Sequence, residues 1–203
     1  MTASLESAAL IVVDVQNDFC PGGSLEVPDG DRVVAVLNGY AARFAAAQRP
    51  VFASRDWHPE HTRHFQEHGG LWPPHCVQGS KGAEFHPNLR LPQGSIVVSK
   101  GQRFDDDGFS AFPSTLEDGR SLAEALRAAS VRRLYIGGLA TDWCVKATVL
   151  DAMAAGFEVT LLLDASCGVN LQPHDAEQAI EEMVRAGATT ATLAQIAEVA
   201  TTP

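Results

Sequence analysis

Short apolar runs alternate along this chain with longer segments in which apolar residues recur at helical spacing. The short runs predict strands at about 8–14, 50–55, 95–100, 132–138 and 157–163, with a further short one near 189–192. The longer segments predict helices at about 31–48, 120–129, 142–155 and 174–186, with a last helix near the end of the chain. Ser121 and Glu124 have the spacing of a capping box at the start of the second helix, and Gly156 and Gly187 close the last two of these four.

This alternation indicates an α/β fold. Strands that alternate with helices form βαβ units, whose right-handed crossovers place the strands parallel to one another. We therefore expect a three-layer α/β/α arrangement with a mostly parallel central sheet that helices cover on both faces. A length of 203 residues and about 45% hydrophobic content suit a single domain spanning residues 1–203.

One long segment, from Asp56 to Gly94, interrupts the alternation and is dense in His, Pro and Gly. A compact domain rarely carries so long a loop unless the loop has a function. The strand Val51–Arg55 leads directly into it, so the loop should lie at the carboxyl edge of the sheet. We expect a binding site, and specifically a metal-binding loop, at about 56–94.

Three of the predicted strands end in, or lead into, a reactive side chain. Asp14 follows the first strand, Lys100 closes the third, and Cys144 comes shortly after the fourth. Ligands of open α/β sheets bind outside the carboxyl ends of the parallel strands. An acid, an amine and a thiol at one edge are typical of a cysteine nucleophile with its base and its electrostatic partner.

The position of Cys144 in the first turn of a predicted helix favours a reactive thiol. Free N–H groups and the positive end of the helix dipole would lower the pKa of the thiol and favour the thiolate. The backbone N–H groups of Ala140 and Cys144 are candidates for an oxyanion hole. Asp14 would act as general base, and Lys100 would hold the charge. The alternatives are a buried structural cysteine, a turn-capping aspartate and a solvated lysine, which the meeting of all three at one edge disfavours.

The long loop carries a group of metal-binding residue types. Asp56 and His58 stand two positions apart, so in an extended segment both can reach one ion. His61 and His64 compete for the third place, and His75 is a further ligand. One carboxylate with imidazoles suits Zn, Fe or Mn. The alternative is a histidine-rich solvated loop without an ion.

Two aromatic residues, Phe19 and Trp72, could form the walls of a site for a flat ring, or could belong to the core. The formal net charge of -10 argues against nucleic acids and anionic membranes as partners. The N-terminal residues do not resemble a signal peptide, and no apolar run reaches the ~20 residues of a membrane span. The four cysteines match no disulfide scaffold, so we expect a cytoplasmic protein with reduced thiols.

Four segments of the chain resemble the nicotinamidases of the isochorismatase-like cysteine hydrolase superfamily, and the likeness covers nearly the whole chain. These segments are 12–25, 56–59, 72–79 and 138–145. The resemblance implies an isochorismatase-like fold with a catalytic triad of Asp14, Lys100 and Cys144. It also implies an oxyanion hole at Ala140 and Cys144, with a cis peptide bond before Ala140.

The resemblance further implies one divalent metal ion held by Asp56, His58 and His75. A fourth histidine in some members precedes a Phe, which favours His64 over His61, because Phe65 follows it. By the same likeness Phe19 and Trp72 would hold the substrate ring.

The activity implied is hydrolysis of nicotinamide to nicotinate and ammonia through a thioester, which feeds NAD salvage, with pyrazinamide as a second substrate. Many members have Tyr where this chain has Phe109, so substrate preference stays open. Two alternatives are a sibling hydrolase acting on another amide or a vinyl ether, and a catalytically silent metal- or ligand-binding member. The sequence leaves a monomer and a homo-oligomer equally open.

Overall fold

The computed structural model describes residues 5–116 and 118–196. Its six strands form one sheet in the order β3-β2-β1-β4-β5-β6, and every neighbouring pair is parallel. The strands are β1 (Ala8–Val13), β2 (Val51–Asp56), β3 (Ile96–Lys100), β4 (Arg133–Leu139), β5 (Glu158–Cys167) and β6 (Thr189–Ala191). The parallel sheet expected from the alternating pattern is confirmed.

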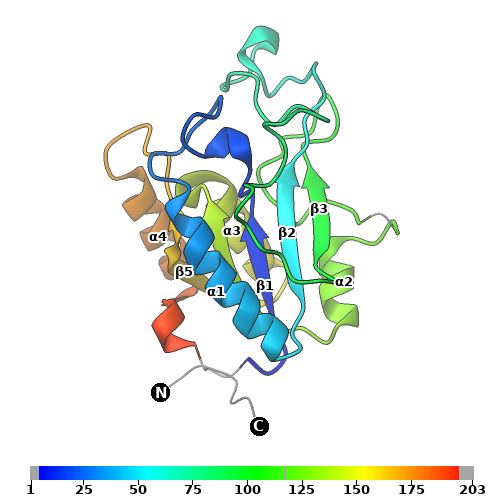
Figure 1. The fold of residues 1–203 in the computed structure, drawn as a ribbon, viewed down its shortest axis with the longest axis vertical. Coiled ribbons are helices and arrows are strands. Elements are labelled where there is room, and N and C mark those ends of the chain that lie inside the picture. The colour runs from blue at the N-terminus through cyan, green and yellow to red at the C-terminus, as the bar shows by residue number, and fades with distance from the viewer. Residues whose placement is uncertain (1–4, 117, 197–203) are drawn as a thin grey trace.

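Four α-helices cover the two faces of this sheet, as the three-layer prediction requires. They are α1 (Arg32–Ala46), α2 (Leu122–Ala128), α3 (Lys146–Ala154) and α4 (Asp175–Arg185). Leu10 and Val12 of β1 pack with buried residues of α1, which crosses in front of the sheet in Figure 1. Ile11 and Val13 of the same strand pack with buried residues of α2, α3 and α4 on the other face. Successive side chains of a strand point to opposite faces, so β1 contributes to both layers of core.

The elements differ from the prediction at three places. The predicted helix 142–155 begins as a π-helical turn, η3 (Thr141–Val145), before α3. The strand predicted at 157–163 continues to Cys167, with a register shift against β4 between Ile136 and Gly138. The last predicted helix is a 3-10 turn, η4 (Leu193–Gln195), and its remainder lies outside the described residues. The capping box of Ser121 and Glu124 is present at the start of α2.

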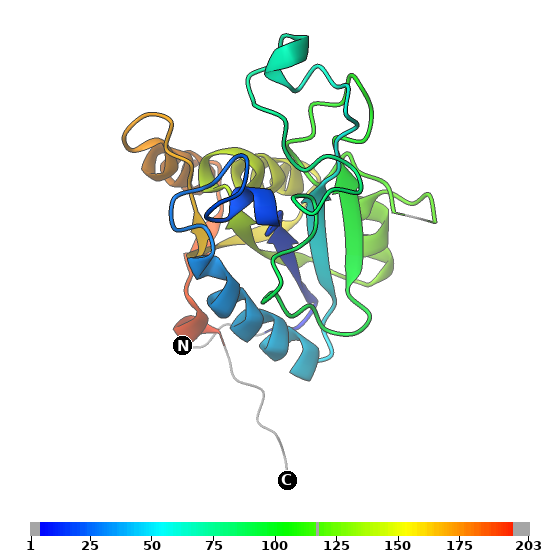
Figure 2. The same ribbon diagram turned by 45° about the horizontal axis from the view of Figure 1, so that its top comes forward.

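The carboxyl ends of the strands form the edge above which the long loop lies. In Figures 1 and 2 the first part of the segment 57–95 rises beyond the ends of β2 and β3 and carries the short turn η2 (Gln66–His68), and its last part, coloured green, runs back along the sheet to the start of β3. A second short turn, η1 (Asn17–Phe19), follows β1 at the same edge. The sheet extends from β1 through β2 and β3 in one direction and from β4 in the other. The crevice at such a change of direction is where ligands of open α/β sheets bind.

Among the helices of the described residues, none has the length and the apolar character needed to cross a membrane.

Candidate active site

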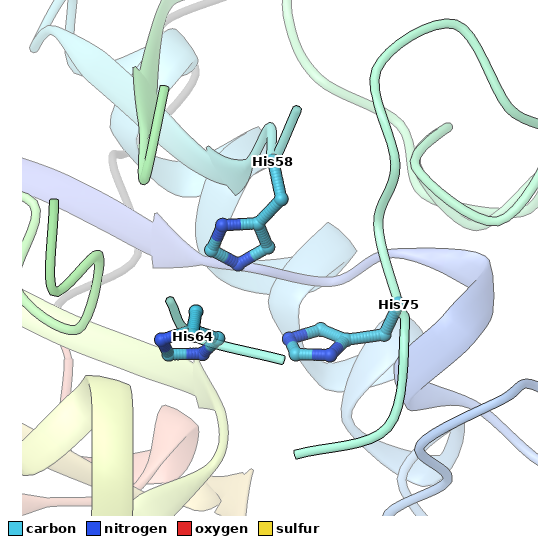
Figure 3. A group of neighbouring side chains, drawn as sticks. All are labelled: His58, His64 and His75. Carbon is cyan, nitrogen blue, oxygen red and sulfur yellow. The ribbon is translucent and has the colours of Figure 1, made fainter. Parts of the chain in front are cut away.

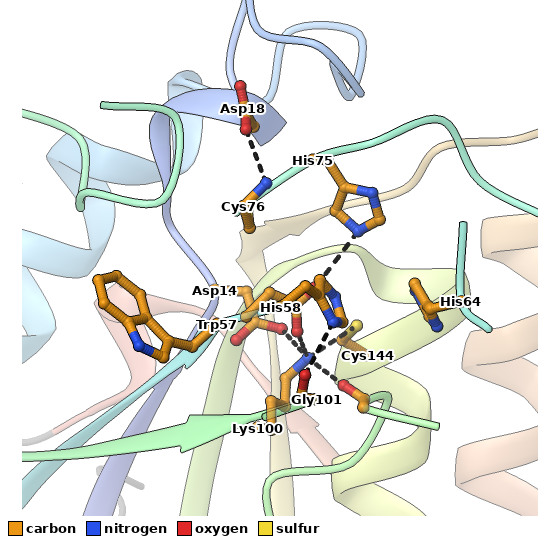
Figure 4. A network of polar contacts seen from close by, with 12 residues as sticks. Asp14, Asp18, Trp57, His58, His64, His75, Cys76, Lys100, Gly101 and Cys144 are labelled. Atoms are coloured by element: carbon orange, nitrogen blue, oxygen red, sulfur yellow. Dashed lines mark hydrogen bonds and ion pairs between the residues drawn. The ribbon is translucent and has the colours of Figure 1, made fainter. Parts of the chain in front are cut away.

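The three reactive residues at the strand ends meet at this crevice. The Nζ atom of Lys100 lies 2.8 Å from Oδ2 of Asp14 and 3.4 Å from Sγ of Cys144. All three side chains are buried, and Figure 4 shows them around the ammonium group. β1 and β4 are neighbours, which brings Asp14 beside the turn that carries Cys144, and β3 delivers Lys100 from the other side of β2.

Lys100 and Ser54 hold the carboxylate of Asp14 in place. The ammonium of Lys100 donates to the carboxylate of Asp56, the carbonyl oxygen of Gly108 and the sulfur of Cys144, and it forms an ion pair of 2.8 Å with Oδ2 of Asp14. Oδ1 of Asp14 accepts a hydrogen bond of 2.8 Å from the hydroxyl of Ser54. A carboxylate oxygen of Asp14 also lies within 4.8 Å of Sγ of Cys144, so this side chain is placed to accept a proton from the thiol.

The backbone of Asp14 is held in a conformation that few residues other than glycine adopt. Its φ is 50°, in the left-handed region, directly after β1 ends. Its N–H donates to the carbonyl of Ser54, so the same neighbour fixes both backbone and side chain. Strain of this kind costs on the order of 1 kcal/mol and persists where surrounding contacts impose it.

Burial sets the protonation of the thiol and the carboxyl group. It raises the pKa of Cys144 well above its ordinary value, and the charges of Asp14 and Asp56 raise it further, against the effect of Lys100. Burial also raises the pKa of Asp14 to about 6, although Lys100 opposes this. The raised pKa of Cys144 favours the thiol over the thiolate expected from the helix terminus, and the neighbouring carboxylate is the group placed to take its proton.

Lys100 keeps its positive charge in this environment. Burial alone would lower the pKa of its ammonium group, but the carboxylates of Asp14 and Asp56 raise it well above the ordinary value. The centre thus contains one buried cation between two buried anions, beside a neutral thiol.

Three histidines of the long loop lie next to this centre. One ring nitrogen from each of His58, His64 and His75 lies within 4.8 Å of the others (Figure 3). Nδ1 of His58 is 3.1 Å from the carbonyl oxygen of Gly101, and Nδ1 of His75 is 2.8 Å from that of Pro73. Each of these rings therefore donates its Nδ1–H to the backbone and keeps a lone pair on Nε2. Such outer hydrogen bonds are the usual support of metal-binding histidines.

The donor set fits a metal ion. Nε2 of His58 is buried and makes no hydrogen bond, which is costly unless an ion or another group satisfies it. Oδ2 of Asp56 lies 3.5 Å from that nitrogen and 3.7 Å from Nε2 of His75. Burial lowers the pKa of His64 to about 3, with a further contribution from His58, so its ring is neutral and can bind a metal. One carboxylate with three imidazoles suits Zn, Fe or Mn.

Asp56 links the histidines to the group formed by Asp14, Lys100 and Cys144. Burial alone would raise the pKa of its carboxyl group, but the positive charge of Lys100 and the adjacent rings of His58 and His75 lower it well below the ordinary value. One of its oxygens faces the ammonium and the other faces the imidazoles.

His61 lies apart from this group. It is exposed, and its Nδ1 lies 3.3 Å from Nε2 of His68, which is also exposed. Of the two histidines that the sequence left open, only His64 lies beside His58 and His75.

Gly101 leaves room for the side chain of His58. Gly101 has a φ of 67°, and a Cβ atom there would lie 2.3 Å from Cε1 of the His58 ring. Its carbonyl accepts from that same ring, so the backbone at this position both leaves room for the imidazole and orients it.

A pocket opens beside the sulfur and contains the aromatic residues expected around a ring. Phe19 and Trp72 both line it and are largely buried, and Ala140 and Cys144 line it as well. The peptide bond between Leu139 and Ala140 is cis, as the resemblance implies. The carbonyl of Ala140 accepts the N–H groups of Trp143 and Val145, which closes the π-helical turn around Cys144.

Five further residues line the pocket that the sequence did not identify as part of its wall. They are Leu25, Val27, Phe109, Trp143 and Val169. Trp143 precedes Cys144 in the chain and contacts Trp72 edge-to-face with ring centroids 4.7 Å apart, so its position beside Cys144 was a usable signal. Leu25 ends one of the segments that resemble the family, whereas Val27 and Val169 come from loops whose sequence carries no sign of the site.

A sequence model described as Isochorismatase domain matches residues 8–195. The nicotinamidase of Escherichia coli is 43% identical over 92% of this chain and 95% of its own length. The nicotinamidase/pyrazinamidase of Mycobacterium tuberculosis is 39% identical over 86% of this chain and 93% of its own length.

Solved structures give the same result. The pyrazinamidase of Pyrococcus horikoshii in complex with zinc has a TM-score of 0.84 and 45% identity, over 92% of this chain and 99% of its own. The PnC1 protein of L. infantum in complex with nicotinate has a TM-score of 0.86 and 36% identity, over 97% of this chain and 98% of its own. The match over nearly all described residues, with the cysteine, lysine and aspartate gathered at one crevice, shows that the chain belongs to the isochorismatase family and groups with its nicotinamidases.

Proposed function

We propose that this protein is an amidohydrolase that converts nicotinamide to nicotinate and ammonia. The observation that carries the proposal is the buried group of Asp14, Lys100 and Cys144, which opens into a pocket beside three converging histidines. The relatives named nicotinamidase, at 43% and 34% identity, support the same substrate. Pyrazinamide, which has a ring nitrogen at the same place, is a second substrate.

The substrate ring lies between Phe19 and Trp72, with its carboxamide toward Cys144. Asp56, His58, His64 and His75 hold one divalent ion, for which zinc is the first candidate because the P. horikoshii structure contains it. Such an ion, when bound, supplies a Lewis acid that can anchor a ring nitrogen.

Asp14 and Cys144 carry out the first half of the reaction. Oδ2 of Asp14 takes the proton of the thiol as Sγ forms a bond to the carboxamide carbon. The backbone N–H groups of Ala140 and Cys144 stabilise the oxyanion, and the ammonium of Lys100 balances the negative charge. When the carbon–nitrogen bond breaks, Asp14 gives its proton to the leaving nitrogen, and ammonia departs from a thioester.

Hydrolysis of the thioester reverses these roles. Asp14, again a carboxylate, takes a proton from a water molecule whose oxygen attacks the thioester carbon. The carbon–sulfur bond then breaks, and the sulfur regains its proton from Asp14. The acid that is released loses its proton to the solvent and leaves as nicotinate.

The test is ammonia release from nicotinamide, pyrazinamide and benzamide, which lacks the ring nitrogen. We expect the first two to be hydrolysed. Replacing the nucleophile in Cys144→Ala should lower kcat by on the order of 10⁶-fold, to the assay background, with an unchanged circular dichroism spectrum. Substantial ammonia release by that variant would refute the nucleophile, and benzamide as the preferred substrate would refute the ring assignment.

A further inference from the structure

The carboxylate of Asp18 lies outside the reacting centre but holds the backbone next to a proposed metal ligand. Its Oδ2 accepts the N–H of Cys76 at 2.7 Å, as Figure 4 shows, and its Oδ1 accepts the N–H of Ser24 at 3.2 Å. Cys76 directly follows His75. The hydrogen bond therefore fixes the peptide group from which the His75 side chain extends toward the other imidazoles.

The backbone of Asp18 ties the pocket wall to the same point. Its carbonyl accepts the N–H of Leu25 at 3.0 Å, and its own N–H donates to the carbonyl of Gly82 at 3.0 Å. The next residue, Phe19, has its ring centroid 5.5 Å from that of His75. One residue thus connects two pocket-lining side chains, Phe19 and Leu25, to the segment that carries the histidine.

The backbone of Cys76 needs such support. Its φ is 45°, in the left-handed region, which is unfavourable for a residue with a Cβ. Hydrogen bonds from an N–H to a carboxylate are among the stronger ones in proteins. The interaction with Asp18 therefore supports Cys76, and with it His75, in this conformation.

Gly82 leaves space for the carboxylate of Asp18. A Cβ atom on Gly82 would lie 2.1 Å from Oδ2 of Asp18. The carboxylate therefore occupies space that only a residue without a side chain leaves free, and its position is set from three sides by Gly82, Cys76 and Ser24.

We infer that Asp18 is a positioning residue for the metal site, which holds His75 in its metal-binding place and joins that ligand to the Phe19 wall. This rests on the proposed metal site. Asp18 touches neither the reacting sulfur nor its partners, so its effect reaches the site through the backbone of Cys76.

The test measures zinc affinity of the full-length protein by competition with a chromophoric chelator. In Asp18→Asn we expect the Kd for zinc to rise by about 10–100-fold, the usual effect of losing an outer support of a metal ligand. The matched control is Asp164→Asn, another partly buried carboxylate, which accepts the hydroxyl of Tyr40 and the N–H of Leu193 at 2.8 Å each. It should lower the thermal unfolding temperature but leave the zinc Kd unchanged.

Gly82→Ala tests the same inference without changing any charge. Its Cβ would displace the Asp18 carboxylate from Cys76, so zinc affinity should fall in this variant too. If the wild type binds zinc and a folded Asp18→Asn or Gly82→Ala variant binds it equally well, the inference is overturned. A wild type that binds no zinc would instead refute the proposed metal site itself.

Discussion

At Cys144, burial rather than the helix terminus determines the state of the thiol. The sulfur accepts a hydrogen bond from Lys100, yet the surrounding protein and the two nearby carboxylates keep its pKa high. Activation therefore depends on transfer of the proton to Asp14 during the attack. The pKa of that carboxyl group, about 6, makes it a stronger base than an ordinary aspartate.

The pH dependence of the reaction follows from Asp14. Its carboxyl group holds a proton below about pH 6 and cannot then accept one from the thiol, so kcat/KM for nicotinamide should fall as the pH drops through that value. The raised pKa of Asp14 also makes the free energy of unfolding depend on pH. Because the folded pKa exceeds the ordinary value of 3.8, the folded state binds more protons, and this group favours folding more as the pH falls from above 6 toward 3.8.

Ser54→Ala separates this effect from other titrations. The hydroxyl of Ser54 donates to Asp14 and lowers the pKa of its carboxyl group, so its removal should move the acid limb of the pH–rate profile to higher pH. Pre-steady-state or steady-state profiles of the two proteins, measured side by side, provide the comparison. An acid limb that stays in place would show that another group controls it.

Sequence reasoning identified residues more readily than their states. Asp14, Lys100 and Cys144 could be placed together because strand ends of a parallel sheet share one edge. The pKa of Cys144 could not be predicted, because it depends on how tightly the loops cover the sulfur. His61 and His64 could not be separated by pattern, because an irregular loop has no period; a hydrogen bond from the His64 N–H to the hydroxyl of Thr62 helps set the turn between them. The roles assigned to all these residues stay predictions until tested.

At the scale of elements, a short loop after β5 completes the pocket. Oδ1 of Asp142 accepts the N–H of Val169 at 2.9 Å, and Oδ2 accepts that of Asn170 at 2.7 Å. Asp142 belongs to the turn η3, which also carries Cys144. One turn therefore carries the proposed nucleophile and holds Val169 in the wall of the pocket.

Removing this anchor should affect substrate binding more than chemistry. In Asp142→Ala two N–H groups lose their carboxylate acceptor, and because Val169 is half-buried and Asn170 exposed, water can replace it, so the main effect is that Val169 is released. We expect KM for nicotinamide to rise more than kcat falls, as steady-state kinetics would show. Asp175→Ala is the control, because that carboxylate holds only the nearby N–H of Gln172. Equal changes in kcat and KM would contradict this assignment.

Element boundaries followed from the hydrophobic pattern because the central strands are continuous apolar runs buried on both faces, whereas helices such as α4 bury one side of a regular period. The pattern could not reveal η3, in which the carbonyl of Ala140 accepts the N–H of Val145 five residues on. That turn is defined by backbone hydrogen bonds, which the spacing of apolar residues does not predict. The extension of β5 to Cys167 was missed for a similar reason, since its register against β4 shifts beside Gly138.

At the scale of the whole molecule, the structure divides into a regular sheet with its helices and a set of loops above the carboxyl edge. Among the described residues, the segment 57–95 contains one regular element, the short turn η2. The proposed ion would join the histidines of this segment to Asp56 at the end of β2. Metal binding is then also a contribution to stability, because an ion that binds only the folded state favours it by mass action.

Removing the metal should therefore loosen the molecule. At a free zinc concentration about 100-fold above Kd, the ion stabilises the fold by about 2.7 kcal/mol. Chelation should lower the thermal unfolding temperature and direct limited proteolysis to 57–95, while the circular dichroism of the sheet and helices changes little. Asp56→Ala should show no further response to chelator. Equal unfolding temperatures with and without stoichiometric zinc would contradict the metal site.

The shared ammonium of Lys100 constrains how such an enzyme can be redesigned. One cation serves the thiol and the ligand carboxylate together, so an engineer who exchanges Asp56 for a neutral donor also alters the nucleophile. Altered substrate range is therefore more safely sought in the aliphatic wall of Leu25, Val27 and Val169, whose side chains can be resized while the charge arrangement around the sulfur is left intact.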